Sequence, residues 1–325
     1  RVRLFKGAVR VTGRRSPVSL YAEALSTFED AGEADTYDQT AATGFTRDAL
    51  GVLALQLEDM QAARDHFGSL YEMGLRRDES AYFIGQIEEQ RKRYEVAVEW
   101  YERVGGSLEL DARVRTARIL AEQGQLAQAR ELLQRMRVQQ PEKAVNLYLI
   151  EGGLVGGAGR RQEVVNLYTK ALQAFPDNPD LLYARALAAA EVGDLPLLES
   201  DLQRILEDDP EHADALNALG YTLADQTDRH QEALVYISRA LELKPDNAAI
   251  LDSMGWLQYR LGNYPEALRY LRRANAMLPD AEIAAHLGEV LWVSGEREQA
   301  RRVWKEALER EPDSPHLRDV LKRFP

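Results

Sequence analysis

The residue types that most often carry chemistry are present in this sequence, but they form no catalytic or metal-binding motif. No two of the five histidines have the spacing of a metal site such as His-Glu-x-x-His. The Gly-x-Ser-x-Gly nucleophile motif is missing, and the absence of cysteine excludes thiolate chemistry. We therefore expect no enzyme activity, no cofactor and no metal site. The histidines, for which we expect surface or groove positions, are His66, His212, His230, His286 and His316.

A glycine-rich run at residues 152–159 invites a phosphate-loop interpretation, which the sequence does not support. No strand pattern precedes the run, and the Gly-Lys-Ser/Thr ending of a phosphate loop is missing. Two of its glycines fall on columns of small residues that recur along the chain. For the others we hypothesise a flexible point, or a place where a bound chain approaches the backbone; a neutral local sequence is the alternative. These other glycines are Gly153, Gly156 and Gly157.

Regularly spaced prolines indicate that the chain is built from a helical repeat. This repeat must position any functional side chain. Proline ends a helix because it lacks the N–H group and its ring clashes with the preceding turn. A stop signal that recurs every 33 to 35 residues therefore predicts a stacked array of helical units. The prolines of this ladder are Pro141, Pro176, Pro210, Pro245, Pro279 and Pro312.

Two further columns predict how the helices of each unit pack. Small residues near the middle of each first helix are Gly51, Gly85, Ala117, Gly152, Ala186, Gly220, Gly255 and Gly288. Bulky residues on each second helix are Phe67, Tyr101, Leu133, Tyr168, Leu202, Ile237, Leu271 and Trp304. Two antiparallel helices approach closely where one side chain is small and a large neighbour fills the wedge. We count about eight such units over residues 44–314.

The two ends of the chain depart from this period. For residues 1–43 we predict a degenerate helical unit, with one helix over 20–31, a helical mate over 1–11 and an acidic loop over 32–44. Residues 315–325 place apolar side chains on one helical face and predict a capping helix, with a docking helix as the alternative. Because the chain starts at Arg1, we expect a processed or truncated product whose targeting or lipid-bearing segment lies upstream.

Composition describes a soluble, folded and acidic protein. The sequence is 45% hydrophobic and 29% charged, and its formal net charge is −12. This charge argues against nucleic acid or an anionic membrane as main partners. No stretch of about 18 apolar residues occurs, so we expect no transmembrane segment.

The columns resemble the tetratricopeptide repeat. The unit from Leu251 to Pro279 carries nearly every position of that repeat, and the resemblance covers most of the chain. It implies an all-α fold, a right-handed superhelical solenoid of antiparallel helix pairs. It also implies that first helices line a concave groove, and that side chains flanking each small residue face that groove.

The groove positions predict a protein-binding surface in which aromatic side chains stand beside polar groups. Core packing between repeats is the alternative for any single aromatic residue. Acidic residues dominate, so neither capture of a C-terminal carboxylate nor a basic stacking groove for nucleic acid is expected. The predicted concave surface comprises Tyr82, Arg118, Tyr183, Asn217, Tyr221, Asp225, Asp252, Trp256, Tyr259, Arg260, Glu289 and Trp292.

Three sequence segments narrow the resemblance to one group of tetratricopeptide-repeat proteins. They are residues 216–225, 250–256 and 284–292. They are similar to tetratricopeptide-repeat lipoproteins of the Gram-negative outer membrane that bind a periplasmic carboxyl-terminal processing protease. This resemblance implies a periplasmic adaptor, tethered to the outer membrane by a lipid anchor, that brings the serine protease to peptidoglycan hydrolases. Two alternatives stay open. The chain could be a scaffold for another envelope assembly, such as a pilus, secretion or polysaccharide export, or the regulatory repeat region of a larger enzyme.

Overall fold

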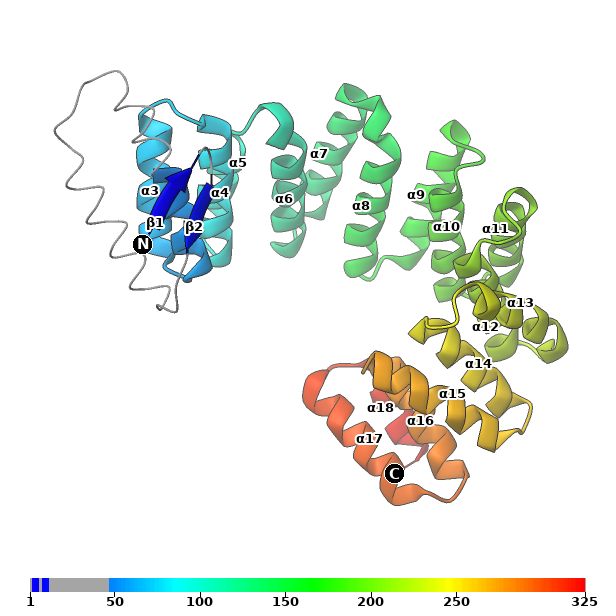
Figure 1. Ribbon diagram of the computed structural model, residues 1–325. Coiled ribbons are helices and arrows are strands. Elements are labelled where there is room, and N and C mark those ends of the chain that lie inside the picture. Colours follow the sequence, from blue (N-terminus) through cyan, green and yellow to red (C-terminus); the bar gives the residue numbers. More distant parts are fainter. Residues whose placement is uncertain (1, 6–7, 12–46, 325) are drawn as a thin grey trace. The chain divides into compact units, whose positions relative to one another are not determined.

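The fold was analysed in a computed structural model that describes residues 2–5, 8–11 and 47–324 (Figure 1). From residue 47 to residue 324 the described chain consists of helices joined by short turns. The predicted all-α array of helix pairs is thereby confirmed for this part. The chain divides into two compact units, residues 1–154 (unit 1) and residues 155–325 (unit 2), and the boundary falls within the helix over residues 144–157.

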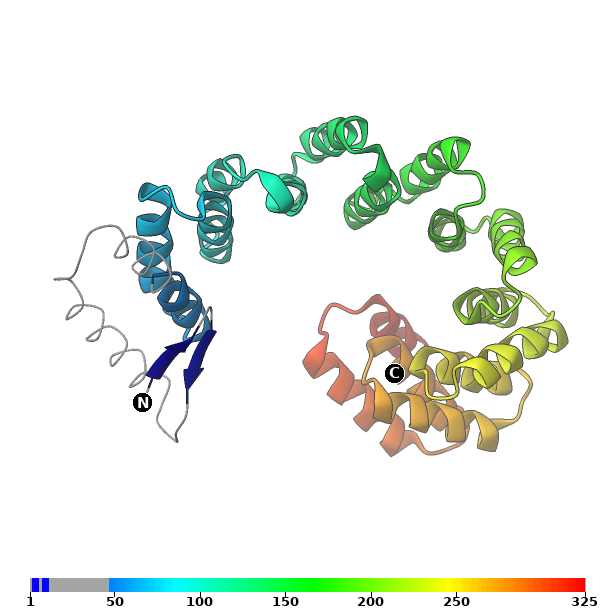
Figure 2. The same ribbon diagram turned by 45° about the horizontal axis from the view of Figure 1, so that its top comes forward.

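Residues 2–5 and 8–11 form two β-strands and not the helix that we predicted over residues 1–11. Strands β1 (Val2–Phe5) and β2 (Ala8–Val11), the blue arrows of Figure 2, pair antiparallel. Val2 lies opposite Val11. Both strands alternate valine or leucine with other residues, and β-branched side chains favour strands over helices. The predicted helix over 20–31 and the acidic loop over 32–44 lie outside the described residues.

Unit 1 continues with alternating first and second helices. Residues 47–56 form a first helix that α3 follows. The later elements are α3 (Met60–Glu72), α4 (Arg77–Gln90), α5 (Tyr94–Tyr101), the 3-10 turn η1 (Gly106–Leu108), α6 (Glu109–Glu122), α7 (Leu126–Gln139), the 3-10 turn η2 (Pro141–Lys143) and α8 (Ala144–Gly157).

Unit 2 contains the remaining helices and ends at α18. They are α9 (Arg161–Ala174), α10 (Pro179–Val192), α11 (Leu195–Asp208), α12 (Ala213–Gln226), α13 (His230–Leu243), α14 (Ala248–Arg260), α15 (Tyr264–Met277), α16 (Ala281–Val293), α17 (Arg297–Arg310) and α18 (Pro315–Arg323). The even-numbered helices from α4 to α16 are the first helices of their pairs. Neighbouring first helices α12, α14 and α16 pack in succession, and α18 packs against α16 (Figure 1).

The proline ladder ends the second helices as predicted. Helix α13 ends at Leu243 and Pro245 follows, and helix α15 ends at Met277 and Pro279 follows. Several first helices, and the terminal helix α18, follow a residue whose side chain accepts a hydrogen bond from a backbone N–H of the first turn, which satisfies an otherwise unpaired donor. These capping residues include Asn178, His212, Asn247, Asp280 and Ser314.

Close contact between small and bulky columns is also confirmed. At five glycines on first helices, an added Cβ atom would lie 2.8 Å or less from a side chain of the partner helix. Such a distance is shorter than any relaxed contact between carbon atoms, which needs about 3.5 Å. Each glycine therefore sets the separation of its helix pair. The pairs are Gly51 with Phe67, Gly85 with Tyr101, Gly220 with Ile237, Gly255 with Leu271 and Gly288 with Trp304.

The C-terminal helix α18 covers the last repeat. Its side chains Leu317 and Val320 are fully buried and belong to the same apolar cluster as Trp304 and Leu291. The stack of a repeat array leaves its terminal apolar surface uncovered unless a further element packs there. Helix α18 supplies that element.

Candidate functional site

Three first helices of unit 2 bring together aromatic rings and carboxylates from three successive repeats. We call this group the aromatic–acid cluster. Each helix contributes two side chains, and each side chain contacts a residue of another repeat. Such fixed polar and aromatic groups are suited to recognition because little order is lost when a partner binds. The cluster comprises Tyr221 and Asp225 of α12, Asp252 and Trp256 of α14, and Glu282 and His286 of α16.

His286 is buried at the centre of this cluster, which corrects our prediction of a surface or groove position. Its Nδ1 lies 2.9 and 3.1 Å from the two carboxylate oxygens of Asp252, and Asp252 is itself 6% exposed. The Trp256 ring stacks on the imidazole, with centroids 4.2 Å apart. Asp252 precedes His286 by 34 residues, which is one repeat, so adjacent first helices place the two side chains face to face.

Burial and charge act in opposite directions on His286. Burial lowers the pKa of this imidazole, because the charged form loses water. The carboxylates of Asp252, Glu282 and Asp225 favour the charged form, and together they raise the pKa of His286 above its ordinary value. The imidazolium form is thus stabilised inside the cluster by three acids.

Two hydrogen bonds fix the aromatic side chains of the cluster. The Tyr221 hydroxyl donates to Glu282 at 3.0 Å, and the Trp256 indole N–H donates to Asp225 at 3.0 Å. Burial, followed by the charges of Glu282, Asp225 and Asp252, raises the pKa of Tyr221. Tyr221 therefore stays a neutral donor at physiological pH. Trp256 is only 7% exposed, so it acts chiefly as packing between repeats.

A second set of residues beyond the cluster pairs a carboxylate with a cation of the chain itself. Glu289 is buried, accepts a hydrogen bond from the Tyr259 hydroxyl at 3.2 Å, and lies 2.9 Å from Arg323 Nη2. Burial and the Glu289 charge raise the pKa of Tyr259 to about 12. Arg323 belongs to α18, so the capping helix places its guanidinium on this surface.

The other predicted surface residues of unit 2 each make a different kind of contact. Trp292 packs on Trp304 and Phe324, with centroids 5.8 and 6.1 Å away, so it fills the gap between the last repeat and α18. Arg260 donates to the backbone carbonyl of Asp225 at 2.6 Å. Half-buried Asn217 leaves its buried Oδ1 without a hydrogen-bond partner in the described chain.

Tyr183 of α10 completes the predicted residues of unit 2. It is half-buried, and its ring centroid lies 6.2 Å from that of His212. Burial, followed by the charge of Asp214, raises the pKa of Tyr183. Leu187, one residue after the small residue Ala186, is 43% exposed on the same helix.

Unit 1 carries a separate polar network on α4, α5 and α6. Arg115 donates to the Tyr82 hydroxyl at 3.1 Å and to Glu89 at 3.0 Å, and Glu89 also accepts from Tyr101. The predicted Arg118 is exposed and does not join this network. Arg118 lies nearly one helical turn further along α6 than Arg115, whose guanidinium is the one beside the Tyr82 side chain.

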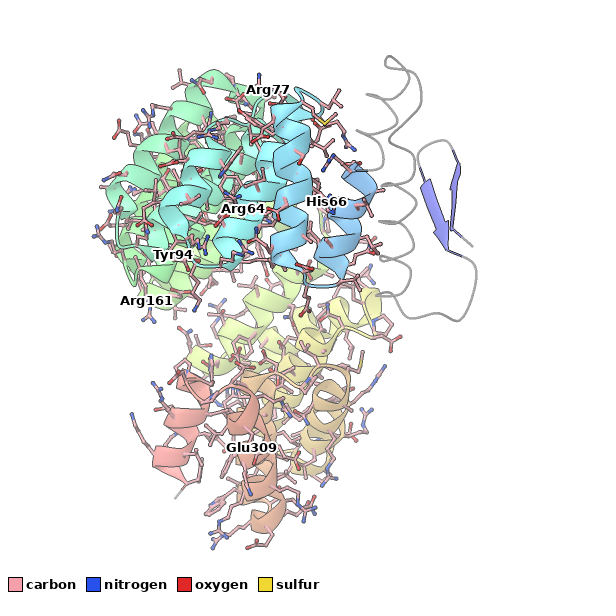
Figure 3. All side chains as sticks on the ribbon, turned by 90° about the vertical axis from the view of Figure 1, so that its left-hand side faces the viewer. Arg64, His66, Arg77, Tyr94, Arg161 and Glu309 are labelled. Carbon is pink, nitrogen blue, oxygen red and sulfur yellow. The ribbon has the colours of Figure 1, made fainter. Side chains whose placement is uncertain are left out.

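Buried carboxylates also lock neighbouring helices of unit 1. Glu88 of α4 is fully buried and accepts from Arg64 of α3 at 2.6 Å, with Arg93 at 3.5 Å; Figure 3 labels Arg64 on its helix. Glu151 of α8 accepts from Arg130 and Arg137 of α7 at 2.8 and 2.6 Å. These pairs position neighbouring helices relative to each other.

The predicted flexible point lies on α8. An added Cβ atom would meet no other atom within 4 Å at Gly153 or Gly157, and at Gly156 the nearest atom would be Val164 Cγ2 at 3.7 Å. Packing therefore does not require glycine at these positions, unlike at the five glycines above. The flexible point stays a prediction.

The described part of the chain contains neither a group of side chains that could hold a metal ion nor a helix that could span a membrane. Among residues 2–5, 8–11 and 47–324, no three histidine, aspartate or glutamate side chains gather into a group that could hold a metal ion. Over the same residues, no helix combines the length and the apolar character that a membrane span needs.

Comparison with known proteins finds two families along the chain. Models of the tetratricopeptide repeat match residues 49–107, 111–143, 199–248 and 258–324. The model of the argininosuccinate synthase C-terminal domain matches residues 1–56. A different family thus matches the segment in which we predicted a degenerate repeat unit.

Individual relatives show the same division. A TPR repeat-containing protein of Pseudomonas aeruginosa is 40% identical over 213 residues, which are 65% of this chain and 36% of that protein. The chain thus spans about a third of this relative's length. Argininosuccinate synthase of a Psychrobacter species is 52% identical over 58 residues, 18% of this chain and 13% of that enzyme. Among solved structures, PilW, a widely conserved type IV pilus biogenesis factor, has a TM-score of 0.51 at 15% identity, covering 67% of this chain and 100% of that chain.

Proposed function

We propose that this chain, which belongs to the tetratricopeptide-repeat proteins, is a non-enzymatic scaffold that binds protein partners. The proposed binding surface is the face of unit 2 formed by the first helices α10, α12, α14 and α16, which we call the first-helix face. The observation that carries this proposal is the aromatic–acid cluster. Its rings and carboxylates come from three successive repeats and are fixed by hydrogen bonds of 2.9 to 3.1 Å. Exposed Leu187 extends the same face onto α10. Fixed aromatic and polar groups beside an apolar side chain suit an extended segment or a helix of a partner.

We further propose that the partners are a periplasmic carboxyl-terminal processing protease and its peptidoglycan hydrolase substrates. Three sequence segments support this proposal through their resemblance to lipoprotein adaptors of the outer membrane: residues 216–225, 250–256 and 284–292. The first two segments include Tyr221, Asp225 and Trp256, and the third segment includes His286. An adaptor of this kind would work in the periplasm, attached to the outer membrane through a lipid anchor outside this chain.

The mechanism needs no catalytic group on the scaffold. A surface that holds protease and substrate together converts their encounter into a local one, with effective concentrations up to about the millimolar range. Bond cleavage would belong to the protease. The short match to argininosuccinate synthase covers too little of that enzyme to carry its activity to this chain.

Two other functions are kept as outcomes of the test. The fold likeness to PilW, at 15% identity, supports the repeat architecture only, so a pilus or another envelope assembly is an alternative partner class. A regulatory repeat region of a larger enzyme is the other alternative, since the chain spans 36% of its Pseudomonas relative.

The test is capture of partners from an envelope extract by three forms of the protein. The first form is the unaltered chain. The second carries Leu187→Glu, which places a charge on the first-helix face. The third carries Val235→Glu on second helix α13, where the side chain is 68% exposed, as a matched control. All three must have the same helical content by circular dichroism.

The adaptor proposal predicts that the unaltered chain and the Val235→Glu control capture the processing protease together with wall hydrolases. The Leu187→Glu variant should lose the hydrolases. Capture of pilus or export components instead would favour the other assembly. If the unaltered chain captures none of these classes, the proposed function fails.

A further inference from the structure

We propose that the aromatic–acid cluster receives a positively charged side chain, arginine or lysine, from an extended segment of the protein partner. The inference rests on the proposed scaffold function and adds the chemistry of the partner. Three observations carry it: the charge balance of the cluster, the arrangement of its rings, and a similar site that the chain fills with its own arginine.

The carboxylates of the cluster outnumber the cations that the described chain places beside them. Asp252 pairs with His286, whose imidazolium Asp225 and Glu282 also stabilise, and Arg260 Nη1 lies 3.9 Å from the Asp225 carboxylate. Glu282 forms no ion pair with any residue of the described chain; the Tyr221 hydroxyl is its hydrogen-bond donor. A carboxylate accepts several hydrogen bonds, so Glu282 and Asp225 both keep acceptor capacity.

The rings of the cluster lie beside these carboxylates. Tyr221 donates to Glu282, and Trp256 donates to Asp225. The centroid of the His286 ring is 6.2 Å from that of Tyr221 and 4.2 Å from that of Trp256. Tyr221 keeps part of its surface exposed, whereas Trp256 does not. A cation above a tyrosine ring and beside two carboxylates gains from both the ring and the charges.

The chain itself provides an example of such a site further along α16, the helix that carries Glu282. There Tyr259 donates to Glu289, and Arg323 of α18 lies 2.9 Å from the Glu289 carboxylate. Glu289 follows Gly288 directly, just as Tyr221 follows Gly220, so the carboxylate of one site and the tyrosine of the other occupy the same column of the repeat. At the Glu282 site no arginine or lysine of the described chain takes this place.

The same charges disfavour other ligands. An anionic partner such as a phosphorylated segment or a nucleic acid would meet Glu282 and Asp225 and would be repelled. An uncharged apolar segment would leave both carboxylates to lose water without gaining a partner. A basic segment satisfies the carboxylates, which is why we commit to it.

The direct test is a titration with defined peptides, followed by fluorescence anisotropy. One dye-labelled dodecapeptide contains glycine, serine and two arginines. The other is identical but has citrulline, the uncharged analogue, at both arginine positions. Each is titrated with the unaltered chain, with the double variant Asp225→Asn, Glu282→Gln, and with the control Glu309→Gln. Glu309 is exposed on second helix α17 (Figure 3).

The proposal predicts that the arginine peptide binds the unaltered chain about tenfold more tightly than the citrulline peptide, the effect of one charge-assisted hydrogen bond. The double variant should lose this preference, and the Glu309→Gln control should keep it. No binding of the arginine peptide, equal binding of both peptides, or an unchanged preference in the double variant would overturn the proposal.

A second measurement uses the unaltered chain alone, in case the double variant does not fold. The pKa of His286 is followed by NMR with and without the arginine peptide. A cation seated beside Glu282 and Asp225 disfavours the imidazolium and should lower this pKa. An unchanged His286 titration at saturating peptide would also overturn the proposal.

Failure of this inference can be told apart from failure of the scaffold function. If the double variant still captures the envelope partners, the cation site is wrong while the scaffold stands. If the unaltered chain captures no partner at all, the scaffold function is wrong whatever the peptides show.

Discussion

Gly288 of α16 lies directly against Trp304 of α17: a Cβ atom at Gly288 would fall 2.0 Å from the indole Nε1. Trp304 is among the largest fully buried side chains of the described chain. The glycine therefore stays in mid-helix because the tryptophan occupies the space that a side chain would need, despite a helix propensity about 1 kcal/mol below that of alanine.

Replacing this glycine should destabilise the protein, because the indole must move. We expect Gly288→Ala to reduce the free energy of unfolding by about 1–3 kcal/mol, as overpacking commonly does. The matched control is Gly153→Ala, where an added Cβ meets no atom within 4 Å. The control should be neutral or stabilising by up to about 1 kcal/mol. Urea unfolding followed by circular dichroism measures both, and equal stability of the two variants would refute the contact.

The His286–Asp252 pair predicts a dependence of stability on pH. Because the folded state raises the pKa of His286, protonation of His286 stabilises the fold fully below the ordinary histidine pKa. That contribution is lost as the pH rises through the raised pKa. We expect the thermal midpoint to fall over this range in the unaltered chain and to fall less in His286→Gln. His316→Gln, at an exposed histidine, should behave like the unaltered chain.

A buried ion pair of unit 2 should contribute far more than an exposed one. Asp201 of α11 is buried and accepts two hydrogen bonds of 2.7 Å from Arg185 of α10. Asp201→Asn leaves a largely buried guanidinium without its counter-ion, which typically costs about 3–5 kcal/mol. Asp177→Asn removes the exposed pair with Arg204 and should change stability much less, because solvent and salt screen these charges. Urea midpoints that shift equally in the two variants would show that burial does not decide the effect.

The glycines of α8 predict a change in local dynamics. Gly156→Ala with Gly157→Ala should slow amide hydrogen exchange within α8 several-fold, since each glycine in a helix costs about 0.5–1 kcal/mol relative to alanine. No steric penalty is expected, because the nearest atom to either added Cβ is at 3.7 Å. Unchanged exchange rates in α8 would show that the extra glycines do not make a flexible point.

The repeat architecture could be predicted from the sequence because it depends on residue type at fixed spacing. Prolines at a regular interval end the second helices, and the pairing of Gly255 with Leu271 follows from size alone. The two N-terminal strands escaped this reasoning, because residues 1–11 were interpreted in the context of the helical repeat and their valine-rich alternation was passed over.

The polar contacts of the site were predictable only in part. Tyr221 and Trp256 were found through their column, but Glu282 and His286 were missed because they lie between the columns expected to face the groove. One signal was available: Asp252 and His286 are separated by one repeat, so adjacent helices bring an acid and a base together. Arg323 could not be placed, because the direction in which α18 packs is not encoded in the repeat period.

The most direct test of the account is site-specific photo-crosslinking on the two faces of unit 2. A photoreactive amino acid is placed at Leu187 on the first-helix face or at Val235 on second helix α13, and each protein is irradiated in envelope extract. The account predicts crosslinks to a processing protease or its hydrolase substrates from position 187 and none of these from position 235. Crosslinks to the same proteins only from position 235, or from neither position, would contradict a partner-binding surface on the first helices.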